Sequence, residues 1–123
     1  MSKFFAALLL TTAPAYATEV SVSCQITNEQ TFTKSPLLGT TMTQKNPLTI
    51  ENFTITDMGI KGYPEGQTST EKAAGSDYRR GIHQSVEIDR KTGVLKEMTQ
   101  GDPDHGITIT IFKDGTCHKQ EGF

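Results

Sequence analysis

The chain has 123 residues, 14 of them acidic and 12 basic, with a net charge of −2. This length is that of a single domain. The basic residues are scattered, and only Arg79–Arg80 and Arg90–Lys91 are adjacent. A protein that binds nucleic acid or anionic lipid needs a concentrated basic surface, so the composition argues against both kinds of partner.

The first seventeen residues predict a cleaved signal peptide. Lys3 gives a positive start, and the apolar run FFAALLLTTA has about half the length of a membrane span. Ala15 and Ala17 occupy the small-residue positions of a cleavage site. We therefore expect a cut after Ala17 and a mature domain of residues 18–123, without a membrane span, in the periplasm or outside the cell.

The two cysteines, Cys24 and Cys117, lie near opposite ends of the mature chain. An exported protein meets an oxidising compartment, so the pair predicts a disulfide. A redox pair or a metal site is the alternative, but neither cysteine belongs to a C-x-x-C motif.

In the first half of the domain, EVSVSCQI (19–26) alternates apolar and polar residues, which predicts a half-buried strand with Cys24 inward. QTFTK (30–34) fits a short second strand, and the proline- and glycine-containing segment 35–47 predicts a loop. Segment 48–60 is again strand-like. Its apolar phase changes between Ile50 and Phe53, which predicts a bulge near Asn52.

In the second half, the polar, glycine-rich segment 61–81 predicts a long loop with at most one helical turn around residues 70–74. IHQSVEI (82–88) and the segment from Val94 predict strands joined by the turn DRKTG, in which Gly93 needs a positive φ. GDPDHG (101–106) and KDG (113–115) predict further turns around the strand GITITIF. The whole pattern predicts an all-β domain, a small antiparallel barrel or sandwich of about 6–8 strands with one disulfide.

Two groups of residues could carry chemistry. His83, Ser85, Glu87 and Asp89 share one face of a strand, but His83 and Glu87 are then about 13 Å apart, too far for one metal ion. A calcium loop starting at Asp102 and including Asp104 and His105 would need a carboxylate at its twelfth position, where Lys113 stands. We therefore predict no catalytic residue, metal or cofactor.

Two loops could contact a partner. Loop 34–47 contains Leu37 and Leu38, and exposed apolar residues in a loop can mark a contact surface. Loop 61–81 contains Tyr78, Arg79 and Arg80, residue types that are frequent at binding hot spots.

The segments VEIDRKTGVL and DGTCHKQEGF resemble small exported bacterial all-β proteins of unknown function, in which an I-D-R-x-T-G hairpin precedes a terminal G-x-C and a final aromatic residue. The likeness covers about the last third of the chain and the position of Cys24. It implies a periplasmic β-domain and supplies no active site.

These features favour a non-catalytic binding protein. The leading hypothesis is a barrel that holds a small ligand in its mouth. The alternative is an interaction or inhibitor module that grips an envelope or extracellular protein with loops 34–47 and 61–81. The third hypothesis is an enzyme that uses the His83 face, which requires an acid from a neighbouring strand.

Overall fold

The computed structural model describes residues 19–104 and 106–120. The predicted signal peptide lies outside the described residues, as do His105 and Phe123. The described residues form nine strands and no helix. The strands are β1 (Val20–Ser35), β2 (Gly39–Lys45), β3 (Thr49–Thr56), β4 (Gly59–Ile60), β5 (Glu65–Thr68), β6 (Lys72–Arg79), β7 (Ile82–Asp89), β8 (Val94–Asp104) and β9 (Ile107–Lys119).

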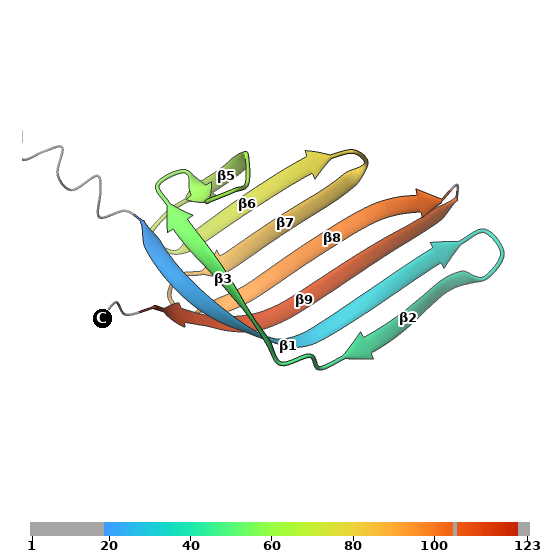
Figure 1. Cartoon of the computed structure of the whole chain (residues 1–123), viewed down its shortest axis with the longest axis horizontal. Helices are drawn as coiled ribbons and strands as arrows, with labels where there is room; N and C mark the ends of the chain where they lie inside the picture. The colour runs from blue at the N-terminus through green and yellow to red at the C-terminus, as the bar shows by residue number, and fades with distance from the viewer. Residues whose placement is uncertain (1–18, 105, 121–123) are drawn as a thin grey trace, which may run out of the picture.

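All nine strands belong to one antiparallel sheet with the order β4-β3-β1-β9-β8-β7-β6-β5 (Figure 1). β2 pairs with the second half of β1, along the same edge that β3 occupies on the first half. At the end of the sheet where β1 begins, the sheet curls until β4 contacts β5 and β6. The predicted all-β domain is confirmed, and the sheet forms a nearly closed barrel.

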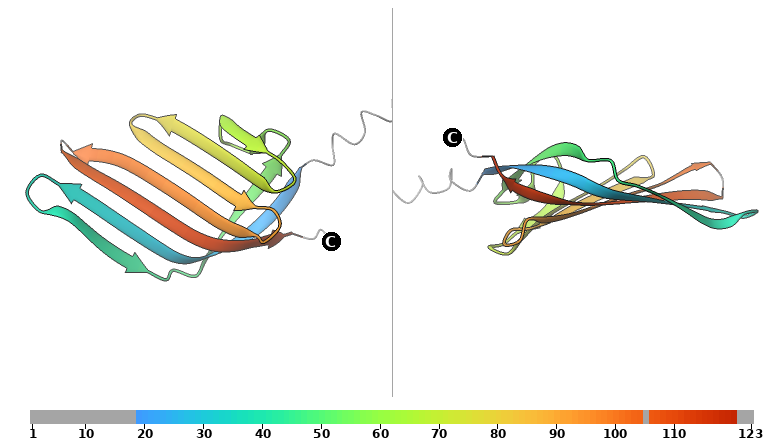
Figure 2. Two further views of the ribbon diagram at one scale, coloured as in Figure 1. Left: turned by 180° about the vertical axis from the view of Figure 1, so that it is seen from behind. Right: turned by 90° about the horizontal axis from the view of Figure 1, so that it is seen from below.

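The barrel closes at one end only. Figure 2 shows the sheet from below, curled where β3, β4 and β5 lie and thin toward the tip of the β1–β2 hairpin. We call this thin region the wing and define it as residues 29–45, 78–83, 99–104 and 107–111. In the wing the sheet is a single layer, so both of its faces are accessible.

The hydrophobic core fills the curled end. Val22, Cys24 and Ile26 alternate along β1 and are all buried, as the predicted strand pattern requires. Cys24 lies directly opposite Cys117 of β9, and the two form the predicted disulfide with a Cα–Cα distance of 3.9 Å. The other buried apolar residues are Ile55, Ile60, Ala73, Val86, Ile88 and Leu95.

The turn between β7 and β8 has the predicted form. The side chain of Asp89 accepts hydrogen bonds from the backbone N–H groups of Lys91 (2.8 Å) and Thr92 (2.9 Å), and these bonds lower the pKa of Asp89. Gly93 has a φ of 82°. The carbonyl oxygen of Gly93 also accepts a hydrogen bond from the backbone N–H of Cys117 on β9, at 2.7 Å. The charged residues of DRKTG therefore belong to a solvent-exposed turn that is stabilised by hydrogen bonds to its backbone.

The predicted turn at KDG is wrong, because β9 runs without interruption through Gly115. A Cβ atom at this glycine would lie 2.3 Å from the carbonyl oxygen of Gln25 on β1. Gly115 therefore lets two strands approach closely inside the sheet. The break in the β1–β9 register falls between Ile26 and Asn28.

Three other predictions are also wrong. Segment 35–47 contains β2, which pairs with β1 over its full length and so overrides its loop-like composition. Segment 61–81 contains β5 and β6 and no helical turn, because β6 is stabilised by pairing with β7 on one side and β5 on the other. β3 pairs with β1 without a bulge, so the phase change only means that Ile50 is exposed on the outer face.

Candidate functional site

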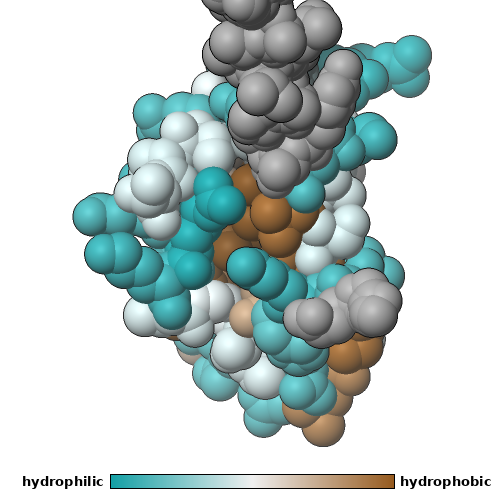
Figure 3. Space-filling view, turned by 90° about the vertical axis from the view of Figure 1, so that its left-hand side faces the viewer, coloured by the Kyte–Doolittle hydropathy of each residue, from teal (hydrophilic) through white to brown (hydrophobic). Residues whose placement is uncertain are grey.

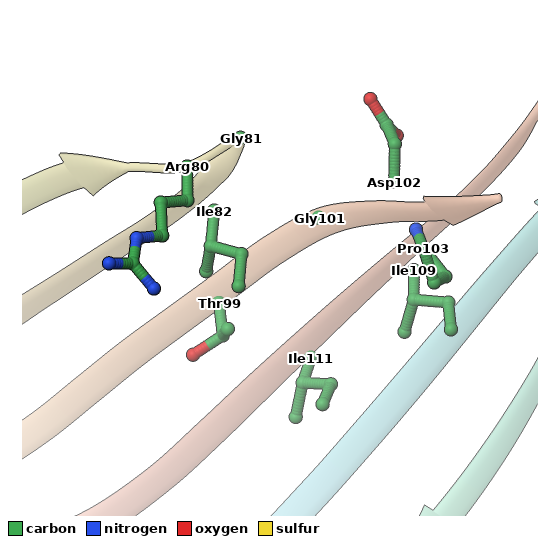
Figure 4. A pocket seen from close by; sticks show the side chains of 9 residues that line it. All are labelled: Arg80, Gly81, Ile82, Thr99, Gly101, Asp102, Pro103, Ile109 and Ile111. Atoms are coloured by element: carbon green, nitrogen blue, oxygen red, sulfur yellow. The ribbon is translucent and has the colours of Figure 1, made fainter. Parts of the chain in front are cut away.

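A groove with a volume of about 350 Å³ lies on the inner face of the wing. We call it the wing groove. Figure 4 shows that Ile82 of β7, Thr99 of β8, and Ile109 and Ile111 of β9 project to the same side of the sheet. The volume lies at the lower end of the range for small-ligand pockets. The remaining lining residues are Arg80, Gly81, Gly101, Asp102 and Pro103.

The groove exists because β8 contributes a glycine, Gly101, at the centre of the groove. Gly101 pairs with Ile109 on one side, and the side chain of Ile82 lies next to it on the other. A Cβ atom at Gly101 would have the Cγ1 atom of Ile82 as its nearest neighbour, at 3.4 Å. The two isoleucines therefore form the walls, and the glycine backbone forms the floor.

A cation stands at the outer rim of the groove. Arg80 and Gly81 connect β6 to β7 with φ values of 53° and 78°, which fits a two-residue type I′ turn. Arg79 forms an ion pair with Asp77 at 2.7 Å, and this hydrogen bond lowers the pKa of Asp77. Among the residues that the structure describes, Arg80 forms no such ion pair. Arg80 is therefore the charged side chain available to a ligand in the groove.

The carboxylate of Asp102 points away from the groove. Figure 4 shows its side chain on the opposite side of the sheet from Ile109. There it accepts a hydrogen bond from the hydroxyl of Thr108 at 2.8 Å. The groove is consequently apolar with a cationic rim.

A polar cluster closes the inner end of the groove. Lys113 and Glu97 are directly opposite each other on β9 and β8, one step along from Ile111 and Thr99 on the same face. The ammonium group of Lys113 lies 3.2 Å from a carboxylate oxygen of Glu51 on β3. The inner face of the sheet thus passes from apolar groove to polar cluster to apolar core.

Glu97 is the most perturbed group of this cluster. Burial, followed by the hydrogen bond and charge of Glu51, raises the pKa of Glu97 to about 7. Its Oε2 atom is buried, and none of the described residues donates a hydrogen bond to it. When protonated, Glu97 has a donor for the carboxylate of Glu51. Burial and the nearby carboxylates of Glu97 and Glu51 also raise the pKa of Tyr63.

Lys113 compensates part of this negative charge. Burial lowers its pKa, but the hydrogen bond and charge of Glu51, together with the charges of Glu97 and Glu29, outweigh burial, and the pKa of Lys113 is raised. Lys113 is therefore charged at neutral pH. Of the described residues, no group of three or more His, Cys, Asp or Glu side chains could hold a metal ion.

A second, smaller hollow lies at the curled end, with a volume of about 160 Å³. Figure 3 looks onto this end and shows hydrophobic surface within a rim of hydrophilic residues. Val22, Ile55 and Ile88 belong to its lining, and the turn 89–93 forms part of the rim. Its walls are members of the core, so this hollow is the end of the packed barrel.

The His83 face lies on the outside of the sheet. Nε2 of His83 is 3.1 Å from the hydroxyl of Ser76 on β6, a residue that the sequence reasoning missed. The ring of His83 also lies against Tyr78, with a centroid distance of 5.5 Å. The cross-strand neighbours of His83 are Tyr78 and Gln100, so neither adjacent strand brings an acid directly opposite. A hydroxyl and a potential base meet here, and neither residue directly opposite His83 on the described strands is a carboxylate that could orient them.

The residues predicted to contact a partner do not form one surface. Leu37 and Leu38 are at the tip of the β1–β2 hairpin, whereas Tyr78, Arg79 and Arg80 are at the tip of the β6–β7 hairpin. Leu37 and Leu38 are strongly exposed, at 94% and 78%. Only Arg80 lines the wing groove. The apolar residues of the groove were assigned to strands, and no local signal indicated a hollow, because Gly101 lies between Gln100 and Asp102 in the sequence and meets Ile82 and Ile109 only across the sheet.

Comparison with known proteins adds no functional assignment. No protein-family model, curated protein or solved structure matches this chain. Within residues 19–104 and 106–120, no helix has the length and apolar character needed to cross a membrane.

Proposed function

We propose that this chain is an exported, non-catalytic binding protein and that the wing groove holds a small aliphatic ligand with an anionic head group. The observation that carries the proposal is the apolar groove formed by Ile82, Ile109 and Ile111 beside Arg80. The signal-like residues 1–17 and the Cys24–Cys117 disulfide support export, since disulfides persist in oxidising compartments.

The chemistry of the ligand follows from the groove. The isoleucine walls favour a branched or linear hydrocarbon body, since burial of apolar surface gains about 25 cal/mol per Å². The guanidinium group of Arg80 favours a carboxylate or a phosphate, which arginine can bind through two hydrogen bonds. The open side of the groove faces solvent, so we expect rapid exchange and modest affinity.

Octanoate is a suitable probe, with 1-octanol as the uncharged control of the same chain length. We expect octanoate to shift the amide resonances of residues 80–82, 99–102 and 109–111 in an NMR titration, and octanol to bind more weakly. Arg80→Asn should abolish the preference for octanoate, and asparagine tolerates the positive φ at this turn position. Equal affinity of the wild type for both probes would refute the role of Arg80.

A substitution that fills the groove tests whether octanoate binds there or elsewhere on the surface. Gly101→Val should place methyl groups between Ile82 and Ile109 and eliminate the octanoate shifts, while valine remains compatible with a strand. Thr116→Val is the matched control, since Thr116 is an exposed residue of β9 outside the groove. Unchanged octanoate binding by Gly101→Val would overturn the proposed site.

The Ser76–His83 contact supports an enzyme as a second candidate. A hydroxyl beside an imidazole is the starting arrangement for nucleophilic catalysis. Esters of p-nitrophenol test this activity directly, with Ser76→Ala and His83→Ala as variants. Hydrolysis that both variants abolish would establish the enzyme and would contradict the non-catalytic proposal.

A further inference from the structure

Strand β2 is an open hydrogen-bonding edge. Its residues pair with β1 from Gly39 opposite Ser35 to Lys45 opposite Glu29, and no other described strand pairs with it. All seven residues of β2 are exposed. Since alternate backbone groups of a strand point to either side, half of the groups of β2 are directed away from the sheet.

The two end strands of the sheet order, β4 and β5, are better protected than β2. β4 contacts β5 and β6, so the two ends of the strand order lie against each other. Natural edge strands are usually blunted by proline, bulges or charges. β2 contains no proline, its register with β1 has no break, and its one charged residue is Lys45 at the very end.

We propose that β2 is a self-association edge, and that two copies of the chain pair their β2 strands antiparallel about a twofold axis through Met42. In this register Thr41 lies opposite the partner's Thr43, and Thr40 lies opposite the partner's Gln44. Gly39 lies opposite the partner's Lys45. The only charge on the edge therefore meets the smallest residue, and no like charges face each other.

The same register brings the most exposed apolar loops together. Gly39 opposite Lys45 is the last pair of this register, so the turn at residues 36–38 of one copy lies at the end of the segment 46–48 that follows β2 in the second copy, and twofold symmetry repeats this contact. Leu37 and Leu38 are 94% and 78% exposed, and Leu48 is 63% exposed. Burial of these leucines would add apolar contact to the backbone hydrogen bonds.

An apolar stripe on the outer face of the wing also continues across the proposed axis. Met42 lies directly opposite Phe32 of β1, whose ring is 5.8 Å from that of Phe112 on β9. Pairing of β2 with itself would join the two stripes at Met42. The open edge of β2, the exposed leucines and the apolar stripe therefore all favour a second copy of this chain as the partner of β2.

Sedimentation equilibrium of the mature protein, with its disulfide intact, tests the proposal. We expect a mass twice that of the monomer. Met42→Lys would bring two ammonium groups together at the axis and should yield monomers over the range where the wild type is dimeric. Met58→Lys is the matched control, because Met58 is an exposed methionine between β3 and β4, and it should remain dimeric. A monomeric wild type, or equal dimerisation of both variants, would overturn the proposal.

Cross-linking tests the register independently of any charge effect. Met42→Cys places two thiols on the axis and should give a disulfide-linked dimer under mild oxidation. Thr40→Cys places them four residues apart, about 14 Å along the strands, which is beyond disulfide reach. Failure of Met42→Cys to cross-link, or equal cross-linking of both variants, would refute the antiparallel register. Neither experiment depends on the ligand proposed for the wing groove.

Discussion

The substitution Glu97→Gln should stabilise the protein at alkaline pH and flatten the pH dependence of its stability. Glu97 is half-buried between Glu51 and Lys113, and its Oε2 atom has no hydrogen-bond donor among residues 19–104 and 106–120. Glutamine has the shape of the protonated acid and keeps a donor for Glu51. The change therefore removes the cost of ionisation while it retains the packing.

The sign and size follow from the pKa. Because the pKa of Glu97 rises from 4.5 to about 7 on folding, the folded protein holds the proton more tightly than the unfolded chain. Its contribution to stability is complete below pH 4.5 and is lost as the pH rises through about 7. At about 1.4 kcal/mol per pKa unit the loss has an upper limit of about 3 kcal/mol. Glu97 is partly solvated and screening reduces this limit, so we expect about 1–2 kcal/mol.

The measurement is urea unfolding of the wild type and Glu97→Gln between pH 4.5 and pH 8.5. Glu87→Gln is the matched control, since Glu87 is exposed on the outer face of β7. The free energies of unfolding of wild type and Glu97→Gln should diverge between pH 5 and pH 8, whereas Glu87→Gln should follow the wild type. A Glu97→Gln variant that is less stable at pH 8.5 would refute the reasoning, because it would mean that the ionised carboxylate stabilises the cluster.

Three further predictions concern the fold. Replacement of both cysteines by serine opens a crosslink between residues 93 positions apart and should lower the free energy of unfolding by about 4–5 kcal/mol, as measured by urea titration. Gly115→Ala should cost about 2–3 kcal/mol because its Cβ would collide with backbone, whereas Gly101→Ala, with only a side chain at 3.4 Å, should keep near wild-type stability; equal losses in the two variants would contradict this. Asp89→Ala should lower the melting temperature, while Asp89→Asn should retain most of it, because only alanine lacks an acceptor for the two backbone N–H groups of the turn. Equal melting temperatures of the two variants would contradict that explanation.

Local chemistry was enough to predict the all-β class, the disulfide and the hairpin turn. The alternation of Val22, Cys24 and Ile26 has the period of a strand with one buried face, and that pattern survives in any sheet. Asp89 and Gly93 encode their turn through a side-chain acceptor and a positive φ, which depend only on neighbouring residues. These features needed no knowledge of distant partners.

The strands β2, β5 and β6 could not be recognised in the same way. Their residues are polar, small or glycine-rich, and their hydrogen bonds are made with strands that have better local signals. Gly115 was misassigned to a turn for a related reason, because its function is to let Gln25 approach from a strand 90 residues earlier. Strand propensity depends strongly on such context.

The sites proposed here depend even more on tertiary structure. Ile82, Gly101 and Ile109 form one groove only because β7, β8 and β9 are adjacent in register. Glu51 and Glu97 meet because the curl of the sheet brings β3 over the inner face of β8, and this proximity raises the pKa of Glu97. The sequence by itself thus determined the strand chemistry, the crosslink and the turn, since these depend on short-range patterns. Only the closed pairing of the sheet decided which side chains line the groove, which carboxylates lie close enough to raise the pKa of Glu97, and which strand keeps an open edge.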